Sequence, residues 1–388
     1  VQALAATTPT ATPTVDPTNE VFVHLEFDSQ DDAALPAIQA ALTQALTEAQ
    51  AAVEDFSAMT TRLRAYAAAQ AKQAKSAQDQ EYLAFVDWLL AGNFIFLGAR
   101  TYDYHAGRDT LQVRVGEGLG LLRQDQASSV FKPTPLGQLA PNLQHYLRGE
   151  RWLNINKGLQ KSTVHREGDI DFISLKITDA KGRMVAEQRY IGLFTSKAYT
   201  APVASIPVVR QKINHILTTE AKTLGLNSHN YKALVSILEN YPRDELFQME
   251  VADLHRISLG ILRLKERQHI KLFTRYSVDA RRVTALVFLP KDRLSTALRL
   301  HIQNLLLQHF HGNQAEYQIH VGEGRLAHYF FTLRLRPDAP AAVDVPAIEK
   351  AIIAAAQAWP EAVQEALQNQ LGKRPGRQLY RRYAHLFG

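Results

Sequence analysis

The sequence predicts a multidomain α+β protein in which antiparallel sheets with flanking helices are joined by helical linkers. Two pairs of alternating apolar and polar runs are each joined by a short turn, as in β-hairpins. A later stretch reads strand, strand, helix, strand, strand, helix, which is a circular permutation of the ferredoxin-like βαββαβ order. Between these regions, apolar residues recur at helical spacing.

The composition is that of a soluble globular protein. The 388 residues are enough for two or three domains, with 46% hydrophobic and 21% charged residues. No apolar run approaches the roughly 18 residues of a membrane span, so we expect no membrane partner. The 44 Lys and Arg exceed the 38 Asp and Glu only slightly and are spread along the chain, which argues against nucleic acid. The absence of cysteine excludes disulfides and Cys-ligated metals and fits a reducing, cytoplasmic compartment.

The first 77 residues are predicted to hold a linker, one strand and a long helix. Residues 1–19 are rich in Thr, Pro and Ala and lack the features of a secretory signal, so we expect a disordered linker. Glu20–Phe27 alternates like a strand, and such a strand needs a partner elsewhere. Acidic residues and Pro36 mark the start of a helix. The helical spacing is kept by Leu35, Ile38, Leu42, Leu46, Val53, Phe56, Met59 and Leu63.

Residues 78–200 are predicted to form one antiparallel α+β domain. A helix and a turn precede a strand at Phe94–Tyr104, and a hairpin through His105–Arg108 leads into a strand at Leu111–Val115. In the second hairpin the turn Asp179–Gly182 joins two alternating runs, and its glycine suits the positive φ of such turns.

Residues 201–268 are predicted to be a helical linker. Its first helix has Pro207 in the first turn and Gly225 just past the end. Two further helices are hinged at Pro242.

Residues 269–371 carry the permuted ferredoxin-like order. The predicted elements are strands Ile270–Arg275 and Val283–Pro290, helix Arg293–His309, strands Ala315–Val321 and His328–Arg336, and helix Pro346–Leu371. The basic tail, residues 372–388, is either a phosphate-binding segment or a solvated helix face.

Two motifs lack the spacing of the sites they suggest. Gly116, Gly118 and Gly120 form G-x-G-x-G rather than G-x-G-x-x-G, so a turn after a strand is expected in place of a dinucleotide site. His309 and His311 have no third metal ligand at suitable spacing, and we interpret them as the end of a helix.

The stretch Leu159–Phe172 has the highest density of side chains that could bind a ligand or take part in a reaction. Its candidate ligands for an anionic effector are Lys161, Ser162, Thr163, His165 and Arg166. A Ser-His-Asp hydrolase would need a nucleophile elbow, which is missing. Charge-assisted hydrogen bonds from the cations and hydroxyls would suit a carboxylate or phosphate. The alternative is that Arg166 pairs with Asp169 or Asp171 and that His165 packs in the sheet.

The run Tyr241, Pro242, Arg243 and Asp244 is predicted to be an interdomain hinge. Pro242 breaks the helix and Asp244 would cap the next one, while Arg243 is solvated or bridges domains. An Arg-Asp catalytic pair is the other interpretation. By itself the sequence supports no catalytic, cofactor-binding or metal site.

Several separated runs are similar, in the same order, to one known family. They are FVDWLLAGNFIFLGARTYDY, GLGLL, KSTVHR, DFISLK, RYIGLFTSKAY, IPVVRQKI, ILENYPRDELFQ, LGILRLKERQHIKLF and LVFLPKDRLST. From about Val21 onward the chain resembles the N-terminal, non-catalytic region of the large bacterial NAD-specific glutamate dehydrogenases.

The resemblance implies a region of ACT-type and PAS-type modules, with 20–77 holding the last strand of a truncated first module. It implies oxidative deamination of L-glutamate with NAD by a cytoplasmic homo-oligomer, whose catalytic region lies beyond this chain. We therefore expect allosteric regulation by an amino-acid effector, no cofactor in this chain, and NAD in the full-length enzyme. The alternative is a structural scaffold that binds no small molecule.

Overall fold

The computed structural model describes residues 23–123, 141–267, 269–277, 280–321, 324–340, 342–356 and 359–383. The chain divides into two compact units, residues 1–46 and 47–388. Within the described ranges every helix is too short or too polar to cross a membrane.

The first unit holds the beginning of a helix but no strand in its described part. Residues 23–31 have no regular secondary structure, so the strand predicted at Glu20–Phe27 is wrong from Val23 onward. Alternating side chains do not make a strand unless a neighbour pairs with its backbone groups. The predicted linker 1–19 and residues 20–22 lie outside the described residues.

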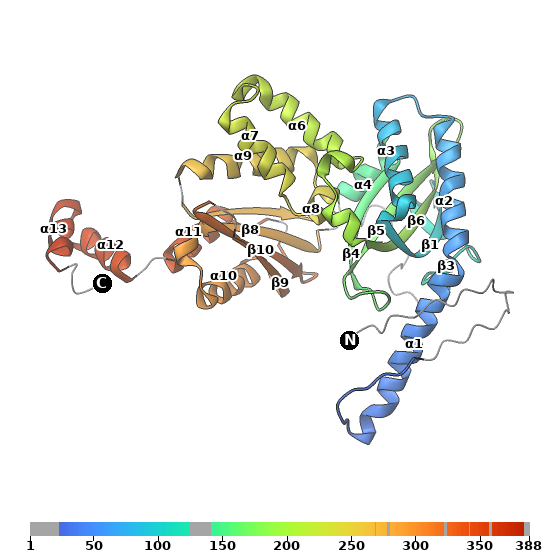
Figure 1. Ribbon diagram of the computed structural model, residues 1–388, viewed down its shortest axis with the longest axis horizontal. Helices are drawn as coiled ribbons and strands as arrows, with labels where there is room; N and C mark the ends of the chain where they lie inside the picture. The colour runs from blue at the N-terminus through green and yellow to red at the C-terminus, as the bar shows by residue number, and fades with distance from the viewer. Residues whose placement is uncertain are drawn as a thin grey trace, which may run out of the picture. The chain divides into compact units, whose positions relative to one another are not determined.

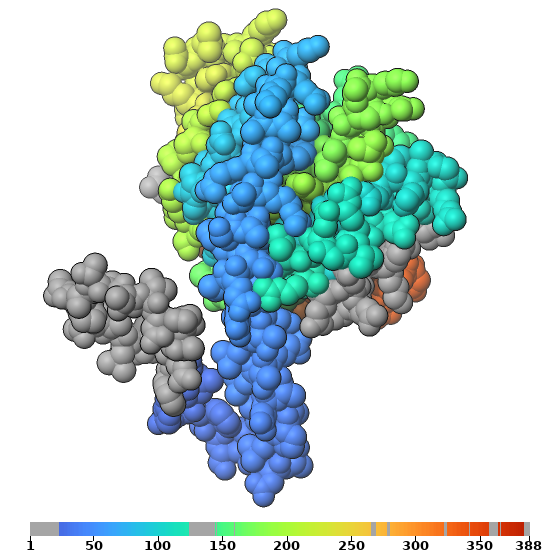
Figure 2. Space-filling view, turned by 90° about the vertical axis from the view of Figure 1, so that its right-hand side faces the viewer, coloured from blue at the N-terminus to red at the C-terminus, as the bar shows by residue number. Residues whose placement is uncertain are grey.

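The predicted long helix is two helices, α1 (Leu35–Glu54) and α2 (Phe56–Ala71), with Asp55 between them. A short 3-10 turn, η1 (Asp32–Ala34), precedes α1. The apolar spacing does not bury the whole length, because Met59 and Leu63 of α2 are fully buried whereas Val53 of α1 is 77% exposed. Figure 2 shows α2 at the surface of the second unit.

Sheet A is antiparallel with the order β2-β1-β6-β5-β4, and the short β3 pairs with β1 (Figure 1). Its strands are β1 (Phe94–His105), β2 (Thr110–Val113), β3 (Leu119–Gly120), β4 (Leu153–Lys161), β5 (Asp169–Thr178) and β6 (Met184–Phe194). Both predicted hairpins are confirmed, and Gly182 has φ +76° in the second turn. We did not predict β4, whose alternation is interrupted at Gly158, where its register with β5 shifts.

Short helical elements surround sheet A. They are α3 (Ala77–Trp88), the π-helical turn η2 (Leu89–Asn93), α4 (Pro141–Arg148), α5 (Ser196–Thr200) and the 3-10 turn η5 (Val203–Ser205). A capping box between Ser76 and Asp79 starts α3, because each residue's side chain bonds the other's backbone N–H.

The helical segment that follows contains α6 (Val209–Leu224), α7 (His229–Glu239), α8 (Arg243–Gln248) and α9 (Val251–Arg267). The break at Pro242 is confirmed, but the prediction of only two helices around it is wrong. Met249 has an extended backbone and separates α8 from α9. The Lys212 Nζ donates to the carbonyls of Leu246, Phe247 and Met249, which stabilises this extra helix end.

Sheet B is antiparallel with the order β7-β8-β10-β9. Its elements are β7 (Lys271–Tyr276), β8 (Arg282–Pro290), the 3-10 turn η6 (Lys291–Arg293), α10 (Thr296–His309), β9 (Gly312–Val321), β10 (Leu326–Leu335) and α11 (Val345–Ala355). The predicted order of strands and helices is confirmed. The strand order is that of a ferredoxin-like sheet whose last strand has moved to the start of the chain.

The helix predicted at Pro346–Leu371 is wrong as a single element. α11 ends at Ala355, and α12 (Trp359–Leu371) follows, with Pro360 in its first turn. A proline disfavours a continuous helix through the residue before it, but fits the first turn of a new one. The described part of the basic tail forms α13 (Lys373–Tyr383).

One core connects sheet A, the helical segment and one face of sheet B. It includes Phe194 and Phe247, whose rings stack 4.1 Å apart, and Phe273 and Phe288 of sheet B. A second core lies between the other face of sheet B and the helices α10 and α11. The two sheets are therefore held by shared apolar contacts as well as by the charges described below.

Candidate functional site

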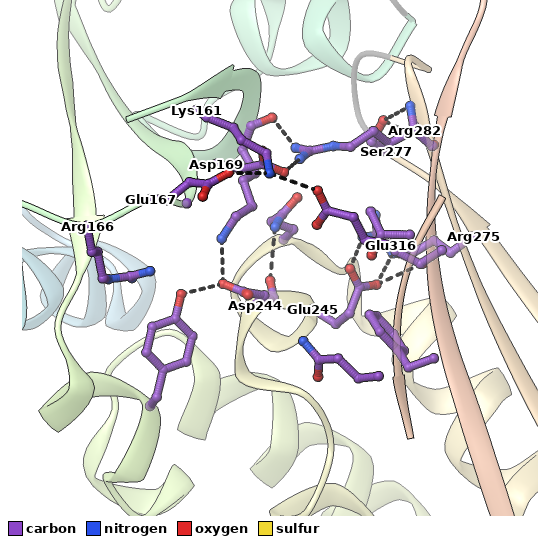
Figure 3. Close-up of a pocket in the computed structure, with 18 residues that line it drawn as sticks. Lys161, Arg166, Glu167, Asp169, Asp244, Glu245, Arg275, Ser277, Arg282 and Glu316 are labelled. Carbon is purple, nitrogen blue, oxygen red and sulfur yellow. Dashed lines mark hydrogen bonds and ion pairs between the residues drawn. The ribbon is translucent and has the colours of Figure 1, made fainter. Parts of the chain in front are cut away.

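A cavity of about 370 Å³ lies between sheet A and sheet B, next to α5 and α8 (Figure 3). Its walls hold as many cations as carboxylates. The cations are Lys157, Lys161, Arg166, Arg275 and Arg282, and the carboxylates are Glu167, Asp169, Asp244, Glu245 and Glu316. Because β4, β5, α8, β7, β8 and β9 all contribute, groups far apart in the sequence meet here.

Two neighbouring residues of α8 send their carboxylates to different sheets. The Asp244 carboxylate accepts hydrogen bonds from Lys157 Nζ on β4 and from the Tyr199 hydroxyl, both at 2.7 Å. The Glu245 carboxylate accepts two bonds from the Arg275 guanidinium on β7, at 2.7 and 2.8 Å. This bidentate pair is almost fully buried, with side chains 6% and 5% exposed. The helix α8 thus connects the two sheets by charge.

Lys157 of β4 belongs to the same network of ion pairs. Its ammonium also lies 3.3 Å from the buried Asp171 carboxylate. Burial disfavours the charge on Lys157, but Asp171 and Asp244 outweigh it and raise the pKa of this lysine. Lys157 is therefore a permanent cation held between two carboxylates.

Further ion pairs cross directly between the sheets. Asp169 of β5 accepts from Arg282 of β8 at 2.8 Å and from Arg334 of β10 at 2.7 Å. Lys161, at the end of β4, lies 2.8 Å from Glu167 and 3.3 Å from Glu316 of β9. The Asp169–Arg282 pair is buried, whereas the Lys161–Glu316 pair is exposed at the mouth of the cavity.

Arg166 differs from the other cations of the cavity. Its guanidinium donates to the Phe194 carbonyl at 3.0 Å and lies 5.9 Å from the Tyr199 ring centroid. Among the residues that the structure describes, no carboxylate pairs with it. Its fork of N–H donors is thus the group in this cavity best able to take the carboxylate of a ligand.

The structure separates the five predicted effector ligands. Lys161 and Arg166 line the cavity, whereas Ser162, Thr163 and His165 do not. The Ser162 hydroxyl bonds to Val164 within its own turn. Thr163 bonds to Glu48, and His165 is exposed with φ +69°.

The alternative interpretation of this loop is wrong on both counts. Asp169 pairs with Arg282 and Arg334, so it does not hold Arg166. Asp171 is occupied by Lys157, and the exposed His165 does not pack in the sheet.

Three of the four predicted hinge residues are buried or bonded to neighbouring groups. Tyr241 is buried, and Pro242 precedes α8 without a side-chain cap. Arg243 donates to the carbonyls of Glu239 and Tyr241 at 2.7 and 3.2 Å, so it is not simply solvated. Asp244 lies in the first turn of α8 and pairs with Lys157, so its assignment as the cap is wrong.

Four residues of the cavity were not predicted from the sequence, namely Lys157, Glu245, Arg275 and Arg282. Three of them lie in or at the start of strands, and a signal was present in the sequence. A charged residue inside an apolar strand is seldom buried without a partner. Arg275 in KLFTRY and Lys157 in LNINKG meet that description and point to a buried ion-pair network.

The two motifs set aside in the sequence have structural roles. Gly118 approaches the Leu122 carbonyl so closely that an added Cβ would lie 2.0 Å from its oxygen, which confirms a tight turn. His309 is the last residue of α10, as predicted for the end of a helix. In the described part of the chain, no group of three or more His, Cys, Asp or Glu is placed to hold a metal ion.

Two family models match the chain. The model described as glutamate dehydrogenase, helical motif 1, matches residues 206–267, and the one described as glutamate dehydrogenase, ACT2 domain, matches residues 271–360. The first covers the helical segment and the second covers sheet B with its helices.

Curated relatives extend this similarity over nearly the whole chain. The NAD-specific glutamate dehydrogenase of Halomonas elongata is 30% identical over 375 residues, which are 95% of this chain and 23% of the relative. That of Pseudomonas aeruginosa is 30% identical over 367 residues, 93% of this chain and 22% of the relative. The chain thus spans less than a quarter of the length of the relatives it matches.

Among solved structures, a blue-light activated histidine kinase of Erythrobacter litoralis EL346 aligns with 61% of this chain and 95% of that chain. The sequence identity is 10% and the TM-score is 0.16.

Proposed function

The chain belongs to the family of NAD-specific glutamate dehydrogenases, and from this premise we propose that it is the regulatory and oligomerising region of such an enzyme. The reaction of the whole enzyme converts L-glutamate, NAD and water into 2-oxoglutarate, ammonia and NADH. Glutamate and NAD then bind to the catalytic region of the same polypeptide, and the present region provides no catalytic residue. The whole enzyme is a cytoplasmic homo-oligomer in this proposal.

The proposal assigns a module to each sheet. Sheet B with α10 and α11 is an ACT-like module within residues 269–371, supported by the ACT2 match and by the ferredoxin-like strand order. Sheet A is a PAS-like module within residues 78–200. Without β3, its strand order is that of the five-stranded antiparallel sheet of PAS domains. Residues 201–268 connect the two modules.

The effector in this proposal is an amino acid that binds in the cavity between the sheets. The observation that carries it is Arg166, a cation that lines the cavity without a carboxylate partner among the described residues. The ligand's carboxylate binds its guanidinium by charge-assisted hydrogen bonds. At the mouth, Glu167 and Glu316 share the single cation Lys161, so they can also accept bonds from an ammonium group.

Binding there has a regulatory consequence because the cavity is built from both modules. A ligand shifts an equilibrium only by its difference in affinity between two arrangements of the protein. A ligand that contacts both sheets binds most tightly at one separation of the sheets, so it favours that arrangement over another. In the whole enzyme this difference sets the upper limit of the coupling free energy between the effector site and the catalytic region.

The test is a thermal-shift series on this chain with the common amino acids, 2-oxoglutarate and NAD. A ligand at a hundred times its Kd stabilises the folded state by about 2.7 kcal/mol. We expect one amino acid to raise the melting temperature and Arg166→Gln to weaken its binding by tenfold or more, which is about 1.4 kcal/mol. The matched control is Arg183→Gln, because Arg183 is an exposed arginine paired with Asp179 in a hairpin turn. Equal loss in both variants would contradict a site at Arg166.

A scaffold that binds no small molecule is the second candidate. The observation in its favour is that the other cations of the cavity already pair with carboxylates of the protein. No thermal shift with any compound, in a chain that melts cooperatively, would support the scaffold over the sensor.

A further inference from the structure

Two histidines on neighbouring strands of sheet B face each other, although a hairpin loop separates them in the sequence. His320 of β9 and His328 of β10 are direct cross-strand partners. Their ring centroids lie 5.0 Å apart, and the ring planes are inclined by 27°. Opposite residues of antiparallel strands project from the same face of the sheet, so the two imidazoles stand together on one face.

Both imidazoles are open to a ligand. Among the described residues neither side chain forms a hydrogen bond or an ion pair, in contrast to His255, which lies 2.7 Å from Glu220. His320 is exposed, and the half-buried His328 has no fully buried ring nitrogen, so solvent reaches both rings. Burial, with His320 beside it, lowers the pKa of His328 to about 4. At pH 7 this imidazole is therefore neutral and has a lone pair to donate.

We propose that His320 and His328 together bind a divalent transition-metal ion such as Zn²⁺, with water completing the coordination. Neutral imidazole is a ligand that suits Zn, Cu and Ni. Zn–N bonds of about 2.1 Å at a tetrahedral angle place the centres of two imidazole rings roughly 5 Å apart. The pair already has this separation. Small turns about the Cβ–Cγ bonds direct one nitrogen of each ring to a common point, because that torsion has broad minima.

The backbone supports this pair better than the pair that the sequence suggests. His309 is the last residue of α10, and His311 lies in the turn after it with φ +51°. His328 lies instead on β10, which pairs with β8 on one side and with β9 on the other. The Phe288 ring of β8 packs 4.9 Å from the His328 ring and limits its motion, while the exposed His320 can turn to meet the metal. A site on paired strands is held more precisely than one in a turn.

The proposed metal site continues one wall of the cavity. The two preceding cross-strand pairs on the same face are Thr332 with Glu316 and Phe330 with Gln318, and all four residues line the cavity. The histidine pair comes next, about 7 Å further along the strands. A bound ion would tie β9 to β10 at the end of this wall. The inference goes beyond the proposed function and does not rest on it, since metal binding is measured without any amino acid.

The first experiment is calorimetric titration of Zn²⁺ at pH 7 into the chain without a histidine tag. We expect the tightest site to hold one ion per chain and to be weakened tenfold or more in His320→Gln and in His328→Phe, because each variant leaves one imidazole. His320→Gln changes an exposed position, so it tests the site even if His328→Phe disturbs folding.

The matched control is His309→Gln, which removes a histidine at the end of α10 and should leave the affinity unchanged. A chain that binds no Zn²⁺ overturns the proposal. Full affinity in His320→Gln, or equal weakening by His309→Gln, overturns it as well.

The second experiment locates the ion by hydrogen–deuterium exchange with mass spectrometry. An ion that binds the folded hairpin reduces its local opening, so Zn²⁺ should slow exchange in peptides from β9 and β10. Peptides from β5 and β6 of sheet A should be unaffected, and the slowing should disappear in His320→Gln. Slowing that is equal in both sheets, or that persists in the variant, would place the ion elsewhere and overturn the proposal.

Discussion

The inner wall and the mouth of the cavity use the same kinds of side chain in opposite ways. On the inner wall, Glu245 and Arg275 are 5% and 6% exposed and pair through two hydrogen bonds. At the mouth, Lys161 and Glu316 are 39% and 50% exposed and lie 3.3 Å apart. A buried pair cannot lose one partner without leaving a desolvated charge, whereas water replaces either partner of an exposed pair. The inner wall therefore fixes the two sheets, and the mouth can exchange partners with a ligand.

The largest effect is expected on the inner wall. Glu245→Ala leaves the Arg275 guanidinium buried without a carboxylate and should lower the free energy of unfolding by about 3–5 kcal/mol. Urea denaturation followed by circular dichroism measures it. The matched control is Glu167→Ala at the mouth, whose side chain is 76% exposed, so we expect a much smaller change because water replaces its partner. Similar losses in the two variants would remove the distinction between wall and mouth.

An intermediate effect is expected from His328, which is partly buried and stacks on His320 and Phe288 without a carboxylate partner in the described residues. Burial, with His320 beside it, lowers the pKa of His328 to about 4. The unfolded chain therefore takes up a proton near pH 6.5 that the folded chain does not. The free energy of unfolding then falls as the pH drops from about 6.5 to 4, by roughly 3 kcal/mol for this residue.

Urea denaturation between pH 7 and 4 tests this on the wild type and on His328→Phe. The phenyl ring keeps the stacking and cannot take up a proton, so the variant should lose less stability over this range. Parallel curves for the two proteins would show that His328 is not the group responsible.

The smallest effect is expected at the mouth. Glu316→Gln and Lys161→Met should each leave the free energy of unfolding nearly unchanged, because water replaces either partner of an exposed pair. Their coupling in a double-mutant cycle should be close to zero and should fall further in concentrated salt, where exposed charges are screened. A coupling as large as that of the Glu245–Arg275 pair would mean that the mouth is as fixed as the inner wall.

Local sequence patterns predicted much of the fold. The hairpin turn at Asp179–Gly182 and the break at Pro242 were readable because glycine and proline act through their own backbone conformations. The order of elements in sheet B was readable because side-chain alternation has a fixed period. The same logic failed at β4, where a bulge near Gly158 disturbs the alternation.

The candidate site was predicted only in part. Lys161 and Arg166 were found because they stand together in one loop with other polar residues. Their neighbours Ser162 and Thr163 lie in the same loop, but Ser162 bonds to Val164 and Thr163 bonds to Glu48, and neither lines the cavity. Glu245, Arg275 and Arg282 come from three other elements, and no spacing along the chain connects them.

The sequence by itself determined the periodicities, the turns and the family resemblance, because these depend on residues close together in the chain or on motifs compared one at a time. Tertiary structure alone decided that Asp244 and Glu245, adjacent on α8, reach opposite sheets, and that Arg166 lines a cavity without a carboxylate partner among the described residues. The physical reason is burial. How much water the surrounding elements exclude decides whether a charged group forms a fixed ion pair, exchanges its partner or binds a ligand. Those elements meet only in the folded protein.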